Sequence, residues 1–170
     1  MRVMGIDPGS NCTGYGIVDD LDGKLHAVAW GVVRNNPRHK FPDRLKKIYQ
    51  GLTEVIQKYS PDTVAVEDIF FAVNAKSALK LAQTRGVILL AAANENKAIA
   101  EYSPLEVKKA IVGYGRAEKS QVSHMVTNLL GLKEAPEPQD ITDALGVAIC
   151  YIHSAGQEAL IQRMQVKARS

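Results

Sequence analysis

The chain has 170 residues, 46% of them hydrophobic and 23% charged, which is ordinary for one globular domain large enough to bury a full core. Its two cysteines, Cys12 and Cys150, are far apart and lack C-x-x-C spacing, which argues against a disulfide framework or a zinc site. The first residues do not resemble a signal peptide and the longest apolar stretch, at 87–93, is too short to cross a membrane, so we expect a cytoplasmic protein.

The first half of the chain predicts a three-stranded antiparallel meander, a helix and a further strand. These elements are expected at residues 2–7, 14–20, 24–33, 42–59 and 63–67. The strands are short runs rich in apolar and β-branched residues, and Asp22-Gly23 is a hairpin signal between the second and the third. The helix carries apolar residues at the 3.6-residue period.

The second half predicts a long helix, a fifth strand and three more helices. These elements are expected at residues 74–94, 97–102, 104–113, 118–130 and about 141–154. Ser103 and Glu106 have the spacing of a capping box, and Gly131 is expected to cap the helix before it. The whole order predicts an α/β fold, with a five-stranded mixed sheet of three antiparallel strands and two parallel additions, flanked by helices. We expect one domain over residues 1–155. For the basic tail, 156–170, disorder and DNA contact both stay open.

The net charge of +3 is a weak indication of a nucleic-acid partner, so the distribution of charge matters more. Basic residues form three clusters. They are Arg34, Arg38, Lys40, Arg44, Lys46 and Lys47; then Lys108, Lys109, Arg116 and Lys119; then Arg163, Lys167 and Arg169. Any one of these clusters is most simply a solvated face. Three clusters together with a group of acids would suit a protein that binds both phosphates and metals.

Two of the predicted strands end in an acid, Asp7 and Glu67. A carboxylate at the end of a buried strand is costly unless it is paired or binds a metal. If the fourth strand lies beside the first, both acids reach the carboxyl edge of adjacent parallel strands, where open α/β sheets bind ligands. Asp7 alone could be a turn residue before Pro8, but two strands with the same ending favour a shared site.

Asp140 and Asp143 stand three residues apart at the start of the last predicted helix, which places both on one face. The ordinary interpretation is that Asp140 is the N-cap of this helix and that the helix dipole favours Asp143. The helix is largely apolar, however, so we expect it to pack inward and bring both charges near the other two acids. Like charges about 6 Å apart repel by roughly 2.8 kcal/mol at an effective dielectric of 20. Such a cluster needs cations, and an all-oxygen site favours two Mg²⁺ ions, or Mn²⁺, as in phosphodiester cleavage.

Four segments resemble the RuvC family of Holliday-junction resolvases. They are GIDPGS-x-x-TGYGIV (5–18), VEDIFFA-x-NA-x-SALKL (66–81), VKKAIVGYGRAEKSQV (107–122) and D-x-x-DAL (140–145). The resemblance implies a ribonuclease-H-like fold and a homodimeric, Mg²⁺-dependent nuclease. Such an enzyme cuts a four-way DNA junction by symmetric paired nicks in recombination and repair, with the branch-migration proteins RuvA and RuvB as partners. It also places the family's catalytic, metal-binding acids on Asp7, Glu67, Asp140 and Asp143.

The resemblance assigns further residues near these acids. Phe70 corresponds to an aromatic that stacks on bases at the opened crossover, whereas we expect Phe71 to pack in the core. Lys108 and Lys119 match two lysines near the scissile phosphate. Other basic side chains are predicted DNA contacts: Lys76, Lys80, Arg85 and Arg116. The helix at 74–94 also carries a stripe of small residues, for which packing on the sheet and a role in the dimer both stay open.

Three alternatives stay open. The segment GIDPGS also resembles the phosphate-binding hairpin of actin-like and sugar-kinase ATPases, but those proteins need a second lobe for which 170 residues leave no room. A module that binds junctions without cutting would not gather four acids against phosphates. A relative within the same fold that processes RNA is disfavoured by the Asp140 and Asp143 pair and by Phe70.

Overall fold

The computed structural model describes residues 1–68 and 75–167, without the side chains of 158–164 and 166–167. The strands are β1 (Arg2–Asp7), β2 (Cys12–Leu21), β3 (Lys24–Arg34), β4 (Thr63–Glu67) and β5 (Ala98–Tyr102). The helices are α1 (Phe41–Tyr59), α2 (Ala75–Asn94), α3 (Pro104–Val112), α4 (Lys119–Leu129) and α5 (Gln139–Lys167). Every predicted strand and helix is therefore confirmed, with small shifts at most ends and a longer last helix.

The five strands form one sheet in the order β3-β2-β1-β4-β5. The pairs β1–β2 and β2–β3 are antiparallel, whereas β1–β4 and β4–β5 are parallel, so the predicted mixed sheet is confirmed. Ile6 of β1 is opposite Val66 of β4 in this register. The next residue of each strand is Asp7 or Glu67, so the two predicted acids finish neighbouring strands at the same edge.

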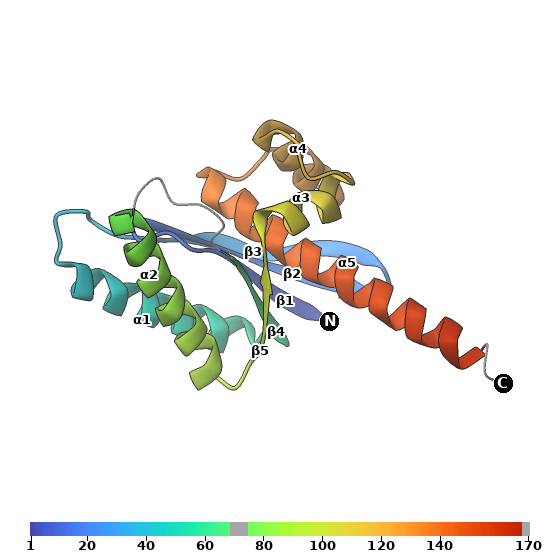
Figure 1. Ribbon diagram of the computed structural model, residues 1–170, viewed down its shortest axis with the longest axis horizontal. Helices are drawn as coiled ribbons and strands as arrows, with labels where there is room; N and C mark the ends of the chain where they lie inside the picture. Colours follow the sequence, from blue (N-terminus) through green and yellow to red (C-terminus); the bar gives the residue numbers. More distant parts are fainter. Residues whose placement is uncertain (69–74, 168–170) are drawn as a thin grey trace.

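The sheet lies between two helical layers (Figure 1). On one face, α1 and α2 bury Met4 and Ile6 in a core with Ile17. On the other face, α3, α4 and α5 pack against Val3 and Ala65. Because side chains alternate along a strand, Asp7 follows Val3 and Gly5 onto the α5 face, and Glu67 follows Ala65 onto that same face.

Glycines in β1 and β2 allow α5 to lie directly on the sheet. A Cβ atom at Gly5 would stand 2.0 Å from the carbonyl oxygen of Ala144, and one at Gly14 would stand 2.0 Å from that of Asp140. At Gly16 it would meet the Leu145 side chain at 2.5 Å. This close approach holds the first turns of α5 over the carboxyl edge of β1.

Local signals in the sequence fix several of the connections. Asp22 and Gly23 both have positive φ, 55° and 83°, as a two-residue hairpin turn with the right-handed strand twist requires. Ser103 and Glu106 form the predicted capping box at the start of α3. Gly131 follows α4 with φ 63°, and its N–H donates to the carbonyl of Asn128, so the predicted cap is confirmed.

The structure corrects the end of the last helix and adds two details. The last helix was expected to end near residue 154, but α5 continues to Lys167, so the backbone of 156–167 extends a helix. Asp140 lies inside the first turn of α5 and is not its N-cap. Trp30 of β3 is 41% exposed, because β3 is an edge strand that α5 covers less than β1 and β2.

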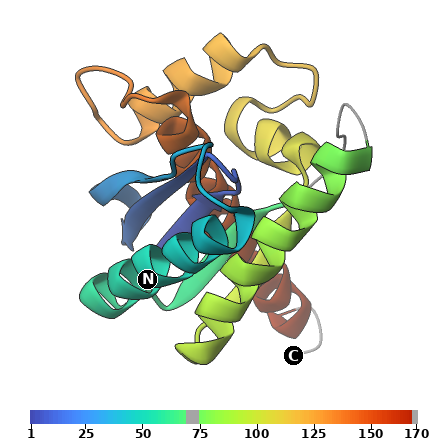
Figure 2. The ribbon, with the colours of Figure 1, turned by 90° about the vertical axis from the view of Figure 1, so that its left-hand side faces the viewer.

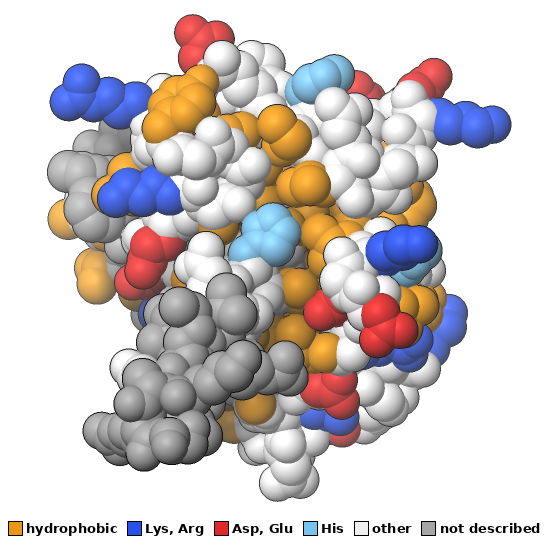
Figure 3. Space-filling view, turned by 90° about the vertical axis from the view of Figure 1, so that its right-hand side faces the viewer, with side chains coloured by type: hydrophobic (Ala, Val, Ile, Leu, Met, Phe, Trp, Pro, Cys, Tyr) orange, Lys and Arg blue, Asp and Glu red, His pale blue; other side chains and the backbone are white. Residues whose placement is uncertain are grey.

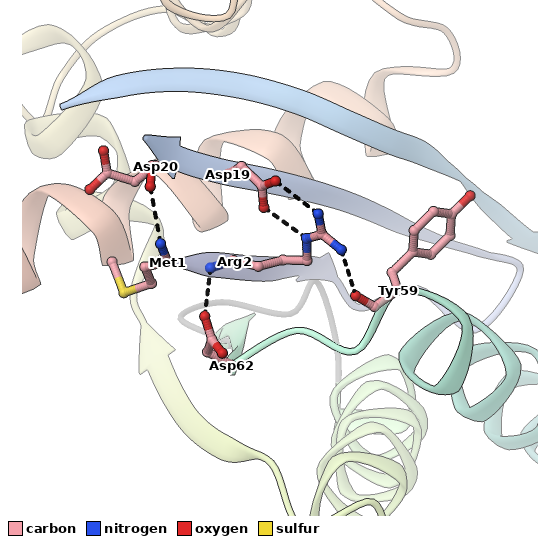
Figure 4. Close-up of polar contacts among 6 residues, drawn as sticks. All are labelled: Met1, Arg2, Asp19, Asp20, Tyr59 and Asp62. Atoms are coloured by element: carbon pink, nitrogen blue, oxygen red, sulfur yellow. Dashed lines mark hydrogen bonds and ion pairs between the residues drawn. The ribbon is translucent and has the colours of Figure 1, made fainter. Parts of the chain in front are cut away.

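Arg2 fixes the end of β1 that lies farthest from Asp7 (Figure 4). Its guanidinium donates to the Asp19 carboxylate at 2.8 and 2.9 Å and to the carbonyl of Tyr59 at 3.0 Å. Its backbone N–H donates to Asp62 at 2.7 Å. These bonds join β1 to β2, to the end of α1 and to the start of β4, and the pairing with Arg2 lowers the pKa of Asp19.

A hollow of about 920 Å³ lies on the side of the molecule shown in Figure 3, between the β2–β3 hairpin, the end of α4 and α5. Leu25, Leu129 and Ile152 line it together with His26 and His153. Asp20 is the one acid among the described residues that line it, so these residues form no carboxylate cluster there. Separately, among the described residues no helix is both long and apolar enough to cross a membrane.

Candidate active site

Three of the four predicted acids surround one cavity of about 260 Å³. The residues that line it are Asp7, Glu67, Pro104, Val107, Lys108, Lys119, Val122 and Asp143. Figure 2 views the molecule from the end where β1 and β4 finish, with α3, α4 and the first turn of α5 above the sheet. The acids thus come from the sheet and from α5, while the two lysines come from α3 and α4.

Burial and mutual repulsion raise the pKa of each acid in the cavity. The pKa of Asp7 is raised to about 8, first by burial and then by the negative charges of Glu67, Asp143 and Asp140. The pKa of Glu67 is raised by burial and then by Asp143, although Lys119 and Lys108 oppose this. Burial also raises the pKa of Asp143, against the effect of Lys119. The site therefore holds more negative charge than its lysines balance.

Lys119 is the nearest cation to the acids. Its Nζ lies 3.4 Å from Oδ2 of Asp143, and its side chain is otherwise largely exposed. Lys108 lies across the cavity on α3 and is half-buried, whereas Lys109 is exposed, as expected for a solvated residue. Both predicted site lysines are thus next to the acids, within reach of a phosphate that approached the cavity.

Asp140 is close to the other acids without lining their cavity. A Cβ at Gly14 of β2 would stand 3.0 Å from that of Asp140, so Asp140 packs directly against β2. Burial and then Asp140 raise the pKa of Cys12, which like Cys150 is a free thiol. Asp140 still contributes to the raised pKa of Asp7, so it belongs to the same electrostatic cluster, at its β2 side.

The chemistry of the four acids is suited to binding a hard divalent cation. They offer only oxygen ligands, they are partly desolvated, and a cation would relieve the repulsion that raises the pKa of Asp7. Within residues 1–68 and 75–167, no three His, Cys, Asp or Glu side chains stand close enough together to form a complete metal site by themselves. Such open sites suit Mg²⁺, which usually keeps several waters and is held by one or two carboxylates together with substrate phosphates.

The remaining predicted DNA contacts are in different surroundings. Lys76, Lys80 and Arg116 are exposed, and Lys80 Nζ stands 5.8 Å from the centre of the Phe41 ring. Arg85 instead joins α2 to the sheet edge, because its guanidinium pairs with Glu101 of β5 and lies 3.2 Å from Asp68. This geometry favours a structural role for Arg85. Phe70 and Phe71 lie outside the described residues.

Sequence reasoning missed the role of Arg44, which it grouped with a solvated basic cluster. Arg44 is only 7% exposed, and its side chain binds the loop that follows Asp7. A signal for this was present, because Arg44 precedes Ile48, Leu52 and Ile56 at four-residue intervals and so shares the buried stripe of α1.

Comparisons with known proteins agree on one family. The family model described as crossover junction endodeoxyribonuclease RuvC matches residues 3–151. A protein of that description from Koribacter versatilis is 50% identical over 99% of this chain and 100% of its own length. The RuvC structure from Thermus thermophilus is 35% identical, with a TM-score of 0.85 over 93% of this chain and 97% of that one.

A second structure shows T. thermophilus RuvC in complex with a Holliday junction substrate. It is 33% identical to this chain, with a TM-score of 0.85 over 92% of this chain and 96% of that one. These neighbours confirm the ribonuclease-H-like architecture predicted from the sequence.

Proposed function

Since this chain belongs to the RuvC family of crossover junction endodeoxyribonucleases, we propose that it is a structure-selective DNA endonuclease that resolves Holliday junctions. It hydrolyses phosphodiester bonds by symmetric paired nicks during recombination and DNA repair. The observation that carries this proposal is the single cavity in which Asp7, Glu67 and Asp143 face Lys108 and Lys119. Carboxylates there would bind cations, and the lysines would bind the negatively charged backbone.

Mg²⁺ is the proposed cofactor, two ions per site, with Mn²⁺ as a substitute. Asp7, Glu67 and Asp143 would hold these ions from the cavity, and Asp140 from its β2 side. Bound by these residues, divalent cations would supply Lewis-acid activation of an attacking water and charge neutralisation at the leaving oxygen. The shared electrostatic cluster supports this assignment, because four acids at close range favour cation binding over holding four negative charges alone.

The lysines have distinct proposed tasks. Lys119 pairs with Asp143 in the absence of DNA and would exchange that partner for a phosphate oxygen when the substrate binds. Lys108, from the opposite wall, would stabilise charge that develops at the scissile phosphate. Lys76, Lys80 and Arg116, which are exposed, would contact the backbone farther away, and Phe70 would stack on bases at the crossover.

Paired nicks require two active sites, and α2 offers a surface on which a second copy could dock. Leu79 is 66% exposed and Leu90 is 53% exposed. Ala82, Gly86 and Ala93 are exposed on the same helix at compatible spacing. Small side chains flanked by two exposed leucines fit a closely packed twofold contact, so we propose a homodimer through α2. By family resemblance, RuvA and RuvB are its proposed partners, and it acts in the cytoplasm.

A gel cleavage assay tests the proposed function. It compares a four-way DNA junction, a linear duplex and a structured RNA, each with Mg²⁺ and with EDTA. Wild type and Asp7→Asn are run side by side. We expect symmetric paired nicks in the junction alone, and only with Mg²⁺ and an intact Asp7. Asp7→Asn should still bind the junction, because the substitution removes no basic contact to the DNA.

Two other outcomes would replace the proposal. Tight junction binding without cuts by the wild type would indicate a binding module. Cleavage of RNA alone would indicate an RNA-processing relative within the same fold. Loss of both binding and cleavage in Asp7→Asn would contradict the assignment of Asp7 as a catalytic residue, provided that its thermal unfolding shows it to be folded.

A further inference from the structure

The loop between Asp7 and β2 is held by bonds to nearly all its oxygen atoms. The Gly9 carbonyl accepts from the Thr13 hydroxyl at 2.7 Å. The Asn11 carbonyl accepts from the backbone N–H of Asn35 at 2.8 Å. The Ser10 carbonyl accepts from the Arg44 guanidinium at 2.7 Å and from the Asn35 side chain at 3.2 Å.

Arg44 reaches this loop from the buried side. Its Nη2 also donates to the Ser10 hydroxyl at 2.8 Å and to Oδ1 of Asn11 at 2.7 Å. All of these acceptors are uncharged, and within the described part of the chain no carboxylate lies within ion-pair distance of Arg44. A guanidinium that is 7% exposed thus carries a positive charge without a counterion, directly beneath the loop.

The loop borders the acid cluster at both of its ends. Asp7 precedes it in the sequence and lines the cavity. Cys12 follows it and begins β2, the strand whose Gly14 packs against Asp140. A substrate phosphate that reached the acids would therefore also meet the outer surface of this loop, where Ser10 is partly exposed.

The Ser10 hydroxyl has one proton to donate, and Arg44 determines where that proton can point. Because Arg44 donates to Ser10 Oγ from the buried side, the oxygen acts as an acceptor there and its own O–H is directed elsewhere. A bond from a charged donor also polarises the hydroxyl and makes it a stronger donor. The uncompensated charge of Arg44 adds a favourable field for an anion at this point.

We propose that Ser10 is a further DNA-contacting residue, which donates to a phosphate of the junction, and that Arg44 is the residue that positions it. This inference rests on the proposed function, because it takes a DNA backbone as the ligand. It assigns to the loop at 8–11 a binding role beside the acids, and it explains why a charged side chain is buried in α1.

The proposal is tested by measuring the affinity for a four-way junction in EDTA, where no cutting occurs. The variants compared with wild type are Ser10→Ala, Arg44→Gln and the double variant. We expect Ser10→Ala to stay folded and to weaken binding about tenfold, since one hydrogen bond to a charged group is lost. Arg44→Gln should weaken binding at least as much. The double variant should bind no more weakly than Arg44→Gln, because the two residues act through one contact.

Arg2→Gln is the matched control, since Arg2 likewise binds a backbone carbonyl but at the far end of β1. It should lower the Tm and leave junction affinity unchanged. If Arg44→Gln fails to fold, Arg44→Lys replaces it in the test. Lysine keeps the positive charge but lacks the planar guanidinium group, so this variant should still bind the junction several-fold more weakly than wild type.

Wild-type affinity in Ser10→Ala or in Arg44→Lys would overturn the inference, as would additive losses in the double variant. Failure of the proposed function would be seen separately, as a wild-type protein that does not bind or cut the junction.

Discussion

Asp7 and Glu67 finish two adjacent parallel strands at the same edge of the sheet, and both line one cavity. The register of β1 and β4 makes them neighbours, and strand alternation turns both toward α5. Burial and the surrounding acids raise the pKa of Asp7 to about 8.

The raised pKa predicts how stability depends on pH when no metal is present. Asp7 is protonated in the folded protein up to about pH 8, whereas in the unfolded chain it loses its proton near 3.8. Its stabilising contribution is therefore complete below about pH 4 and is lost as the pH rises through about 8. We expect the Tm in EDTA to fall between pH 6 and pH 9. The Tm of Asp7→Asn should fall less over the same range. An equal dependence of Tm on pH in the two proteins would contradict the raised pKa of Asp7.

Divalent cations should restore the folding stability that is lost as the pH rises. A cation that binds only the folded protein at ten times its Kd stabilises it by about 1.4 kcal/mol, or a Tm increase of roughly 3–6 °C. Because the cation competes with the proton on Asp7, the increase with Mg²⁺ should be larger at pH 8.5 than at pH 6. Thermal unfolding at both pH values measures it. Glu67→Gln/Asp143→Asn is the control and should show no increase, whereas an equal increase in that variant would place the cation elsewhere.

The sequence predicted the fold well because each element has a local signal. The apolar runs that end in Asp7 and Glu67 gave the strands, and the Ser103 capping box gave the start of α3. The three acids that share a cavity were also predictable, since strand ends and helix starts fix their positions. What could not be predicted depends on packing between distant segments.

Arg44 and Arg85 illustrate that limit. Both looked like exposed basic residues that could contact DNA, because their partners are far away in the sequence. Arg44 binds Ser10, 34 residues away, and Arg85 binds Glu101 across the gap between α2 and β5. The position of Asp140 outside the cavity likewise depends on how closely α5 lies on Gly14, which a spacing of three residues does not reveal.

The contact between α5 and the sheet predicts a large effect for Gly5→Ala. The new methyl group would stand 2.0 Å from the Ala144 carbonyl oxygen, so α5 or β1 must move. Overpacking against backbone costs at least about 3 kcal/mol, or roughly 6–12 °C in Tm. Gly156→Ala is the control in exposed helix, where a Cβ meets nothing within 4 Å, and it should raise stability by about 0.5–1 kcal/mol. A Gly5→Ala protein of wild-type Tm would contradict the close packing.

Phe70 stays a prediction that kinetics can test. If its ring stacks on bases at the opened crossover, Phe70→Ala should lower the single-turnover cleavage rate more than it weakens junction binding. The neighbouring Phe71→Ala is the matched control, and as a core residue it should lower the Tm by more than it lowers the cleavage rate. Unchanged cleavage in Phe70→Ala would assign Phe70 to packing.

The exposed face of α2 predicts that a single charge can separate the two copies of a dimer. Leu90 is 53% exposed, so Leu90→Arg should leave the folded subunit intact while it places two like charges near a twofold contact. Sedimentation should then show a monomer in place of a dimer, and paired nicks should become uncoupled single nicks. Leu21→Arg is the matched control, because Leu21 is 55% exposed at the β2–β3 hairpin, away from α2. Dissociation by Leu21→Arg but not by Leu90→Arg would move the dimer contact to the hairpin side of the molecule.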